Sequence, residues 1–234
     1  MILEIEKLTA SYGISQILFG INIQVASAET VCILGRNGVG KTTTLRTIMG
    51  IIKPNSGSVK YNGTDISGMP PYKISRLGIA YVPQGRHIFQ NLTTNENLLI
   101  SARRGNNQAT EWTIQRIYDL FPILKDRKNF RGRSLSGGEQ QMLCIARGLM
   151  QNPKLLLMDE ISEGLGPIII KGLQEVVQQL KKSGVSILLA EQRIKFAMEI
   201  SDRCYILEKG KVVYSGNTTE IPQETMQQYL LASG

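Results

Sequence analysis

Apolar and polar residues alternate near the start of the chain, and apolar residues form short continuous runs further along. The alternation predicts strands over 2–8, 18–25 and 58–61, with turns at Tyr12-Gly13 and at 54–57. Continuous runs are typical of strands buried on both faces, and they cover 30–34, 78–82, 154–158, 185–190 and 203–207. Helical patterns cover 43–49, 93–100, 112–120, 168–180, 193–200 and about 220–231, and a further helix starts near Ser136.

The order of these elements predicts an α/β fold. Strands that alternate with helices form a mostly parallel sheet covered by helices. The helical stretch between about 90 and 150 interrupts the alternation, so we expect it to form a separate lobe. We therefore predict one domain with a core of about 1–88 and 152–234 and an inserted helical subdomain of about 89–151.

The composition is that of a globular protein. The chain has 234 residues, of which 42% are hydrophobic and 20% charged, and no apolar run is long enough to span a membrane. Cys32, Cys144 and Cys204 each lie in an apolar stretch, which indicates buried reduced thiols rather than a metal site. The net charge of +8 fits an anionic membrane surface, nucleic acid or bound phosphate. Because aromatic residues are not interleaved with the basic ones, we do not expect nucleic acid as a partner.

Residues 35–42, here called the phosphate loop, match the pattern G-x-x-x-x-G-K-[ST] between a predicted strand and a predicted helix. Glycines let successive N–H groups point at one anion, and the positive end of the helix faces the same place. We expect Lys41 to reach the β- and γ-phosphates of a nucleoside triphosphate and the Thr42 hydroxyl to coordinate Mg²⁺. The predicted contacts are Gly35, Asn37, Gly38, Gly40, Lys41, Thr42 and Thr43.

Two carboxylates follow the buried strand at 154–158. Strand ends are where open α/β sheets place their ligands. We expect Asp159 to hold Mg²⁺ opposite Thr42, and Glu160 to accept a proton from the attacking water.

A second glycine-rich segment starts the helix after Ser136. Ser136 is a favourable N-cap, and Glu139 three residues later completes a capping box. Gly137 and Gly138 leave backbone N–H groups open to an anion. We call residues 136–139 the signature segment, because Leu135 to Gln140 resembles the signature motif of ABC transporter ATPases and lies between the phosphate loop and Asp159, as in that family.

The resemblance covers essentially the whole chain and implies further features. It implies a P-loop NTPase core with an N-terminal antiparallel β subdomain and an inserted helical subdomain. Tyr12 matches the residue that stacks on adenine, and Gln84 matches the glutamine that touches Mg²⁺ and the attacking water. In this family two subunits pair head to tail, so ATP is held between one phosphate loop and the signature segment of a second ABC ATPase subunit. The other implied partners are transmembrane permease subunits at the cytoplasmic face of the membrane and, indirectly, a solute-binding protein.

Three positions depart from the family pattern. Gln192 stands where most members have a histidine that contacts the γ-phosphate, and Gln192 can donate a hydrogen bond but cannot take up a proton near neutral pH. This leaves Glu160 as the candidate base. Ile161 and Gly166 replace the usual proline and aspartate, which puts crosstalk between two ATP sites through that aspartate in doubt.

The departures resemble ATPase subunits of branched-chain amino-acid importers, in particular Glu191-Gln192, the stretch 163–167 and the stretch 83–93. The brief helix at about 220–231 resembles the end of the shorter of the two ATPase subunits that such importers use. The related urea importer ATPases also fit. A permease would dock beside Gln84, and the apolar side chains of Ile88, Phe89 and Leu92 either contact it or pack inside the helical lobe.

Other functions account for fewer of these motifs. A soluble ABC ATPase that acts on DNA or ribosomes usually has tandem units, coiled coils or zinc-binding cysteines. A regulatory module without catalysis would not need Lys41, Asp159 and Glu160 together. A GTPase would explain the D-x-x-G match at 65–68, but the sequence has no Asn-Lys-x-Asp guanine reader.

Overall fold

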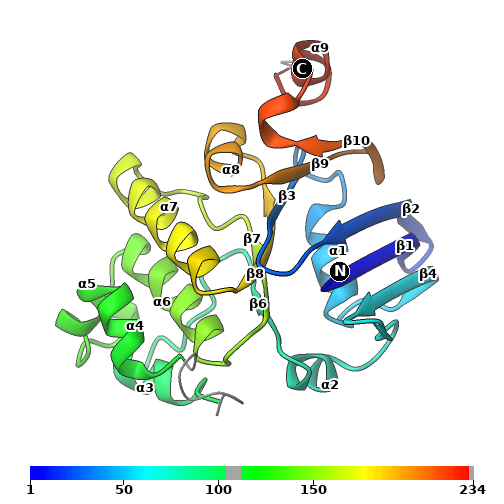
Figure 1. Ribbon diagram of the computed structural model, residues 1–234. Helices are drawn as coiled ribbons and strands as arrows, with labels where there is room; N and C mark the ends of the chain where they lie inside the picture. The colour runs from blue at the N-terminus through cyan, green and yellow to red at the C-terminus, as the bar shows by residue number, and fades with distance from the viewer. Residues whose placement is uncertain (104–111, 232–234) are drawn as a thin grey trace.

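A six-stranded sheet forms the centre of the computed structural model, which describes residues 1–103 and 112–231 (Figure 1). The strand order is β10-β9-β3-β8-β7-β6, and all neighbours are parallel except β10, which is antiparallel to β9. The strands are β3 (Thr30–Leu34), β6 (Ile79–Val82), β7 (Leu155–Asp159), β8 (Ser186–Glu191), β9 (Arg203–Glu208) and β10 (Lys211–Asn217).

A second, antiparallel sheet is built from four strands within the first 65 residues. Its order is β2-β1-β4-β5, with β1 (Leu3–Tyr12), β2 (Ser15–Val25), β4 (Pro54–Tyr61) and β5 (Thr64–Asp65). The predicted turn at 54–57 is wrong, because β4 runs through it and pairs with β1 as far as Pro54. Proline is tolerated as the first residue of a strand. Gly57 has φ +83°, and a Cβ there would lie 2.4 Å from the Lys7 carbonyl oxygen, so the glycine serves a close approach of two strands and not a turn.

Helices pack on both faces of the central sheet, with α1 on one face and α6, α7 and α8 on the other. Helices α3 to α6 lie together, far from the antiparallel sheet (Figure 1). Helices α2 and α5 were not expected from the sequence, because helices of 6 and 5 residues are too short to show a helical period. The α-helices are α1 (Lys41–Ile48), α2 (Pro71–Arg76), α3 (Thr94–Leu99), α4 (Ile114–Leu120), α5 (Pro122–Asp126), α6 (Gly137–Leu149), α7 (Pro167–Lys182), α8 (Ile194–Ile200) and α9 (Gln223–Thr225). Two 3₁₀ turns cover Gly132–Ser134 and Thr218–Glu220, and a π-helical segment covers Met226–Leu231.

Alternate residues of each central strand enter two different hydrophobic clusters. On β3, Val31 and Ile33 pack with the antiparallel sheet and α1, whereas Cys32 and Leu34 pack with α6, α7 and α8. Both faces of the sheet are therefore buried along its parallel strands, which is why those strands are continuous apolar runs in the sequence. These findings confirm the predicted fold class.

The boundaries at about 89 and 151 stay a prediction. One cluster of buried side chains includes Ile117 and Phe121 of the helical region as well as Leu34 and Ala80 of the central strands. The helical region therefore shares a core with one face of the sheet. All three cysteines are free and buried, as predicted. Among residues 1–103 and 112–231, no helix is long and apolar enough to cross a membrane.

Candidate functional site

The phosphate loop connects the carboxyl end of β3 to the first turn of α1. Gly35, Gly38 and Gly40 have φ values of +152°, +80° and +112°, which L side chains rarely adopt. A Cβ on Gly35 would also lie 2.6 Å from the Leu207 carbonyl oxygen, and one on Gly40 would lie 2.8 Å from a methyl carbon of Leu18. Glycine is therefore favoured by conformation at all three positions, and at Gly35 the Leu207 carbonyl also leaves no space for a Cβ.

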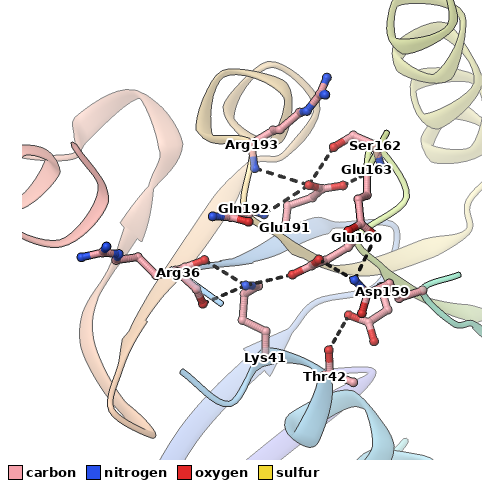
Figure 2. A network of polar contacts seen from close by, with 12 residues as sticks. Arg36, Lys41, Thr42, Asp159, Glu160, Ser162, Glu163, Glu191, Gln192 and Arg193 are labelled. Carbon is pink, nitrogen blue, oxygen red and sulfur yellow. Dashed lines mark hydrogen bonds and ion pairs between the residues drawn. The ribbon is translucent and has the colours of Figure 1, made fainter. Parts of the chain in front are cut away.

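Lys41 is buried, with 3% of its surface exposed, and its ammonium group lies at the centre of the loop. It donates hydrogen bonds to the carbonyl oxygens of Gly35 and Arg36 at 2.9 and 3.0 Å. It also forms an ion pair with Oε1 of Glu160 at 3.1 Å (Figure 2). The lysine is thus aimed at the space in front of the loop, next to the carboxylate predicted to be the base.

Asp159 faces Thr42, as the sequence predicts. The Thr42 hydroxyl donates to Oδ1 of Asp159 at 3.0 Å, and the Tyr81 hydroxyl donates to Oδ2 at 2.9 Å. Burial raises the pKa of the Asp159 carboxyl, and the hydrogen bonds from Tyr81 and Thr42 oppose that rise. Carboxylate and hydroxyl oxygens are ligands that Mg²⁺ prefers, so this pair fits a magnesium ion.

Glu160 follows β7 in a left-handed conformation with φ +46°. A side chain other than glycine rarely adopts this conformation, and such residues cluster at functional sites. Its N–H donates to the carbonyl of Ala190 on β8 at 2.8 Å, which holds the backbone. The Gln84 amide donates to Oε2 of Glu160 at 3.0 Å and to Oε2 of Glu163 at 2.9 Å. Gln84 therefore meets the candidate base directly.

Most of the predicted nucleotide contacts line one cavity of about 350 Å³. This volume lies in the range of small-molecule sites. The Tyr12 ring stands at its edge, and the Tyr12 hydroxyl accepts a hydrogen bond from Nη1 of Arg46 at 3.4 Å. Ile17 also lines the cavity and was not predicted, because an apolar residue in an alternating strand carries no signal of a ligand. The lining residues are Tyr12, Ile17, Asn37, Gly38, Gly40, Lys41, Thr42, Thr43, Gln84 and Glu160.

The signature segment does not line this cavity. It starts α6, and the predicted capping box is confirmed: Ser136 Oγ accepts from the Glu139 N–H, and the Glu139 carboxylate accepts from the Ser136 N–H. Glu139 also accepts from Nε of Arg127 at 3.1 Å. Burial tends to raise the pKa of Glu139, but the donors of Ser136 and Arg127 outweigh it, so the pKa is lowered. The segment is thus ordered by its own chain while Ser136 is exposed.

Gln192 and His87 are both exposed, and neither lines the cavity. Gln192 follows directly after β8, and its N–H donates to Oε2 of Glu191 at 3.2 Å.

A second cavity, of about 300 Å³, also borders Glu160 and shows residues that the sequence analysis missed. Arg86 donates to the carbonyls of Glu163 and Gly164 at 3.1 and 3.4 Å. A Cβ on Gly137 would lie 2.5 Å from Nη1 of Arg86, so this guanidinium also covers the signature segment. Arg86 and Tyr81 lie within three residues of Gln84, and only the contacts of the folded chain single them out. The lining residues are Gly85, Arg86, Gln141, Glu160, Glu163 and Gly164.

Comparisons with known proteins agree with this geometry. A model of the ABC transporter family matches residues 18–163. BraG of Pseudomonas aeruginosa, a high-affinity branched-chain amino acid transport ATP-binding protein, is 42% identical over 90% of this chain and 91% of its own. LptB of Haemophilus influenzae, a lipopolysaccharide export system ATP-binding protein, is 32% identical over 94% of this chain and 92% of its own. A solved ATP-binding subunit of an ABC transporter superposes with a TM-score of 0.81 at 28% identity, over 93% of this chain and 90% of that one. The chain therefore belongs to the ABC transporter family, as an ATP-binding and ATP-hydrolysing subunit.

Proposed function

We propose that this chain powers an importer for branched-chain or other amino acids from the cytoplasmic face of a membrane, as one half of a head-to-tail dimer. The observation that carries the catalytic part is the meeting of Lys41, Thr42, Asp159 and Glu160 at one edge of the sheet. Support for amino acids is the 42% identity to BraG, against 32% to LptB. The LptB relative shows that cassettes of this type also serve other transport systems, and the urea importers named above are the second candidate.

The site residues divide the work of hydrolysis. Lys41 binds the β- and γ-phosphates. Without nucleotide, its ammonium group contacts three oxygens, which are the carbonyls of Gly35 and Arg36 and the Glu160 carboxylate. A phosphate oxygen that takes the place of Glu160 on Lys41 leaves the Glu160 carboxylate free to accept a proton from water. Thr42, Gln84 and Asp159 are the residues that would hold Mg²⁺, which supplies charge neutralisation at the phosphates.

The proposed dimer follows from what the cavity lacks. The phosphate loop, Gln84 and Glu160 share one cavity, but the signature segment lies outside it and exposes Ser136. The helix start at Ser136 presents N–H groups and the positive end of a helix dipole, which suit a phosphate. A second subunit that brings its own signature segment to this cavity completes the site.

The permease contact is proposed at Phe89. Its ring is 46% exposed, and the guanidinium of Arg147 lies 4.5 Å from the ring centroid and donates to the His87 carbonyl at 2.6 Å. Ile88 and Leu92 are partly buried, and Ile88 packs against the core.

The contact is tested by crosslinking from Phe89→Cys in the assembled transporter, with Ile88→Cys as the less exposed neighbour. No crosslink to the permease from a transporting complex contradicts the contact.

Glu160→Gln is the test of the catalytic assignment. The amide cannot accept the proton, so hydrolysis falls at least about 100-fold while ATP still binds. The variant accumulates as an ATP-bound dimer, which size-exclusion chromatography with light scattering measures. Glu175→Gln, which removes an exposed carboxylate from α7, is the matched control and keeps turnover. Near-normal turnover by Glu160→Gln overturns the assignment of the base.

The solute is tested with the transporter itself. The complex reconstituted in liposomes is assayed for ATP-driven uptake of labelled leucine and of labelled urea. Leucine uptake that depends on Glu160 supports the amino-acid importer, and urea uptake alone supports the second candidate.

A further inference from the structure

Glu191 is a buried carboxylate that the proposed mechanism does not use. It ends β8 and is 1% exposed. Its Oε1 accepts from the Ser162 N–H at 3.0 Å, and its Oε2 accepts from the Ser162 hydroxyl at 2.9 Å. Its Oε2 also lies 3.2 Å from the Gln192 nitrogen and 3.5 Å from the Arg193 nitrogen, both of which donate to it. One side chain thus joins two segments that lie 29 residues apart in sequence (Figure 2).

The charge of Glu191 is held by N–H and O–H donors. Within residues 1–103 and 112–231, no lysine, arginine or histidine forms an ion pair with it. Burial raises the pKa of Glu191, and the donors of Ser162, Arg193 and Gln192 oppose the rise. A buried carboxylate is tolerated only where such donors face it. The donors and the carboxylate therefore fix each other in one arrangement.

The two joined segments follow neighbouring strands, and one of them directly follows the candidate base. Ser162 comes two residues after Glu160, and β7 and β8 are neighbouring parallel strands with Asp159 opposite Ala190. Arg193 adds a second tie, because its Nη1 donates to the Leu165 carbonyl at 3.4 Å. Glu191 and Arg193 thus flank Gln192 and hold the turn 162–165 from both ends.

We propose that Glu191 is a positioning residue for ATP hydrolysis, which holds the Gln192 backbone and the turn after Glu160 in one fixed arrangement. This proposal rests on the proposed role of Glu160 as the base and on the family resemblance that aligns Gln192 with the residue that contacts the γ-phosphate. The Glu191 carboxylate links these two segments by hydrogen bonds. This chain has Gly166 and Gln192 at the positions where the family usually has aspartate and histidine.

Glu191→Gln tests the proposal with little change in shape. An amide has one acceptor oxygen, so one of the N–H donors now faces an NH₂ group and the arrangement loosens. We expect kcat to fall about 10- to 100-fold while KM for ATP changes less than about threefold, since small misplacements cost rate and not binding to the phosphate loop. Ser162→Ala, which removes only the hydroxyl donor, lowers kcat about 3- to 10-fold. Glu175→Gln is the matched control for loss of a carboxylate.

The double variant separates positioning from a general loss of stability. If Glu191 acts through Ser162, adding Ser162→Ala to Glu191→Gln lowers kcat no further. Unchanged kcat in Glu191→Gln, or fully additive losses in the double variant, overturns the proposal. If Glu191→Gln does not fold, Ser162→Ala alone decides it by the same split between kcat and KM. Glu160→Gln is assayed in parallel: normal turnover there refutes the proposed function, whereas its loss together with an unaffected Glu191→Gln refutes only the positioning role.

Discussion

The phosphate loop and the signature segment differ in how many contacts their key side chains make within the chain. Lys41 is buried and already touches two carbonyls and Glu160. Ser136 is exposed, and its side chain accepts a hydrogen bond from the first turn of its own helix. The first region is a loop whose lysine is held within its own chain, whereas the second begins a helix at an exposed serine. The comparison favours a site whose two parts come from different chains, and the predictions below test that division.

The largest effect is expected when the two regions are disabled in separate chains and then mixed. Lys41→Ala removes the charge that binds phosphate, and Ser136→Glu places a negative charge where the proposed partner's γ-phosphate lies. Each variant alone loses hydrolysis. A mixture at equal concentrations recovers up to about a quarter of wild-type activity, because half of the dimers are mixed and each has one intact site out of two. Steady-state phosphate release measures the recovery.

The control for this mixture is the ATP affinity of each variant measured alone. Ser136→Glu binds ATP as a monomer with wild-type affinity, since the signature segment does not line the cavity of its own chain. Lys41→Ala loses about 10- to 100-fold in affinity, the effect of one charge-assisted hydrogen-bond partner. If the mixture stays inactive although mixed dimers form, the two regions do not act across a shared interface.

The two regions also differ in how much of them a sequence can predict. The phosphate loop and the capping box of Ser136 depend on residues within eight positions of each other, so spacing alone identifies them. The contacts of Arg86, Tyr81 and Glu191 join segments that lie 29 to 78 residues apart, and no local pattern marks them.

The same reason explains the error in the fold. The five parallel strands of the central sheet were predicted because burial on both faces makes each one an apolar run, whereas the half-exposed strand β10 was missed. Strand β4 was cut short because Pro54 and Gly57 favour a turn in isolation, whereas pairing with β1 decides their conformation in the folded chain.

Asp159→Asn should change hydrolysis and stability in opposite directions. Hydrolysis falls about 100-fold or more, because the amide is a poor ligand for Mg²⁺. Burial raises the pKa of Asp159 in the folded state, so the fold loses stability as pH rises and this carboxyl ionises. The neutral amide removes that cost, and we expect a Tm higher by roughly 2–4 °C at pH 7. The difference shrinks as pH falls through the ordinary pKa of aspartate, about 3.9, because the carboxyl then becomes protonated in the unfolded state as well.

Differential scanning calorimetry of the nucleotide-free proteins between pH 3.5 and 8 measures this effect. Thr42→Val, which removes one donor to Asp159, is a useful companion and should move the Tm the other way. An Asp159→Asn variant whose Tm is lower than wild type throughout this range contradicts the argument from burial.

The smallest effect separates the two roles of Ser136. The chain has a second capping box, in which Thr93 and Glu96 start α3 in the same way that Ser136 and Glu139 start α6. Thr93→Ala and Ser136→Ala each remove an N-cap worth about 1 kcal/mol, so both lower the Tm by roughly 2–4 °C. Only Ser136→Ala should lower hydrolysis, by roughly 3- to 10-fold, because only its hydroxyl faces the proposed partner's phosphates. Equal losses of hydrolysis in the two variants would mean that Ser136 does no more than begin its helix.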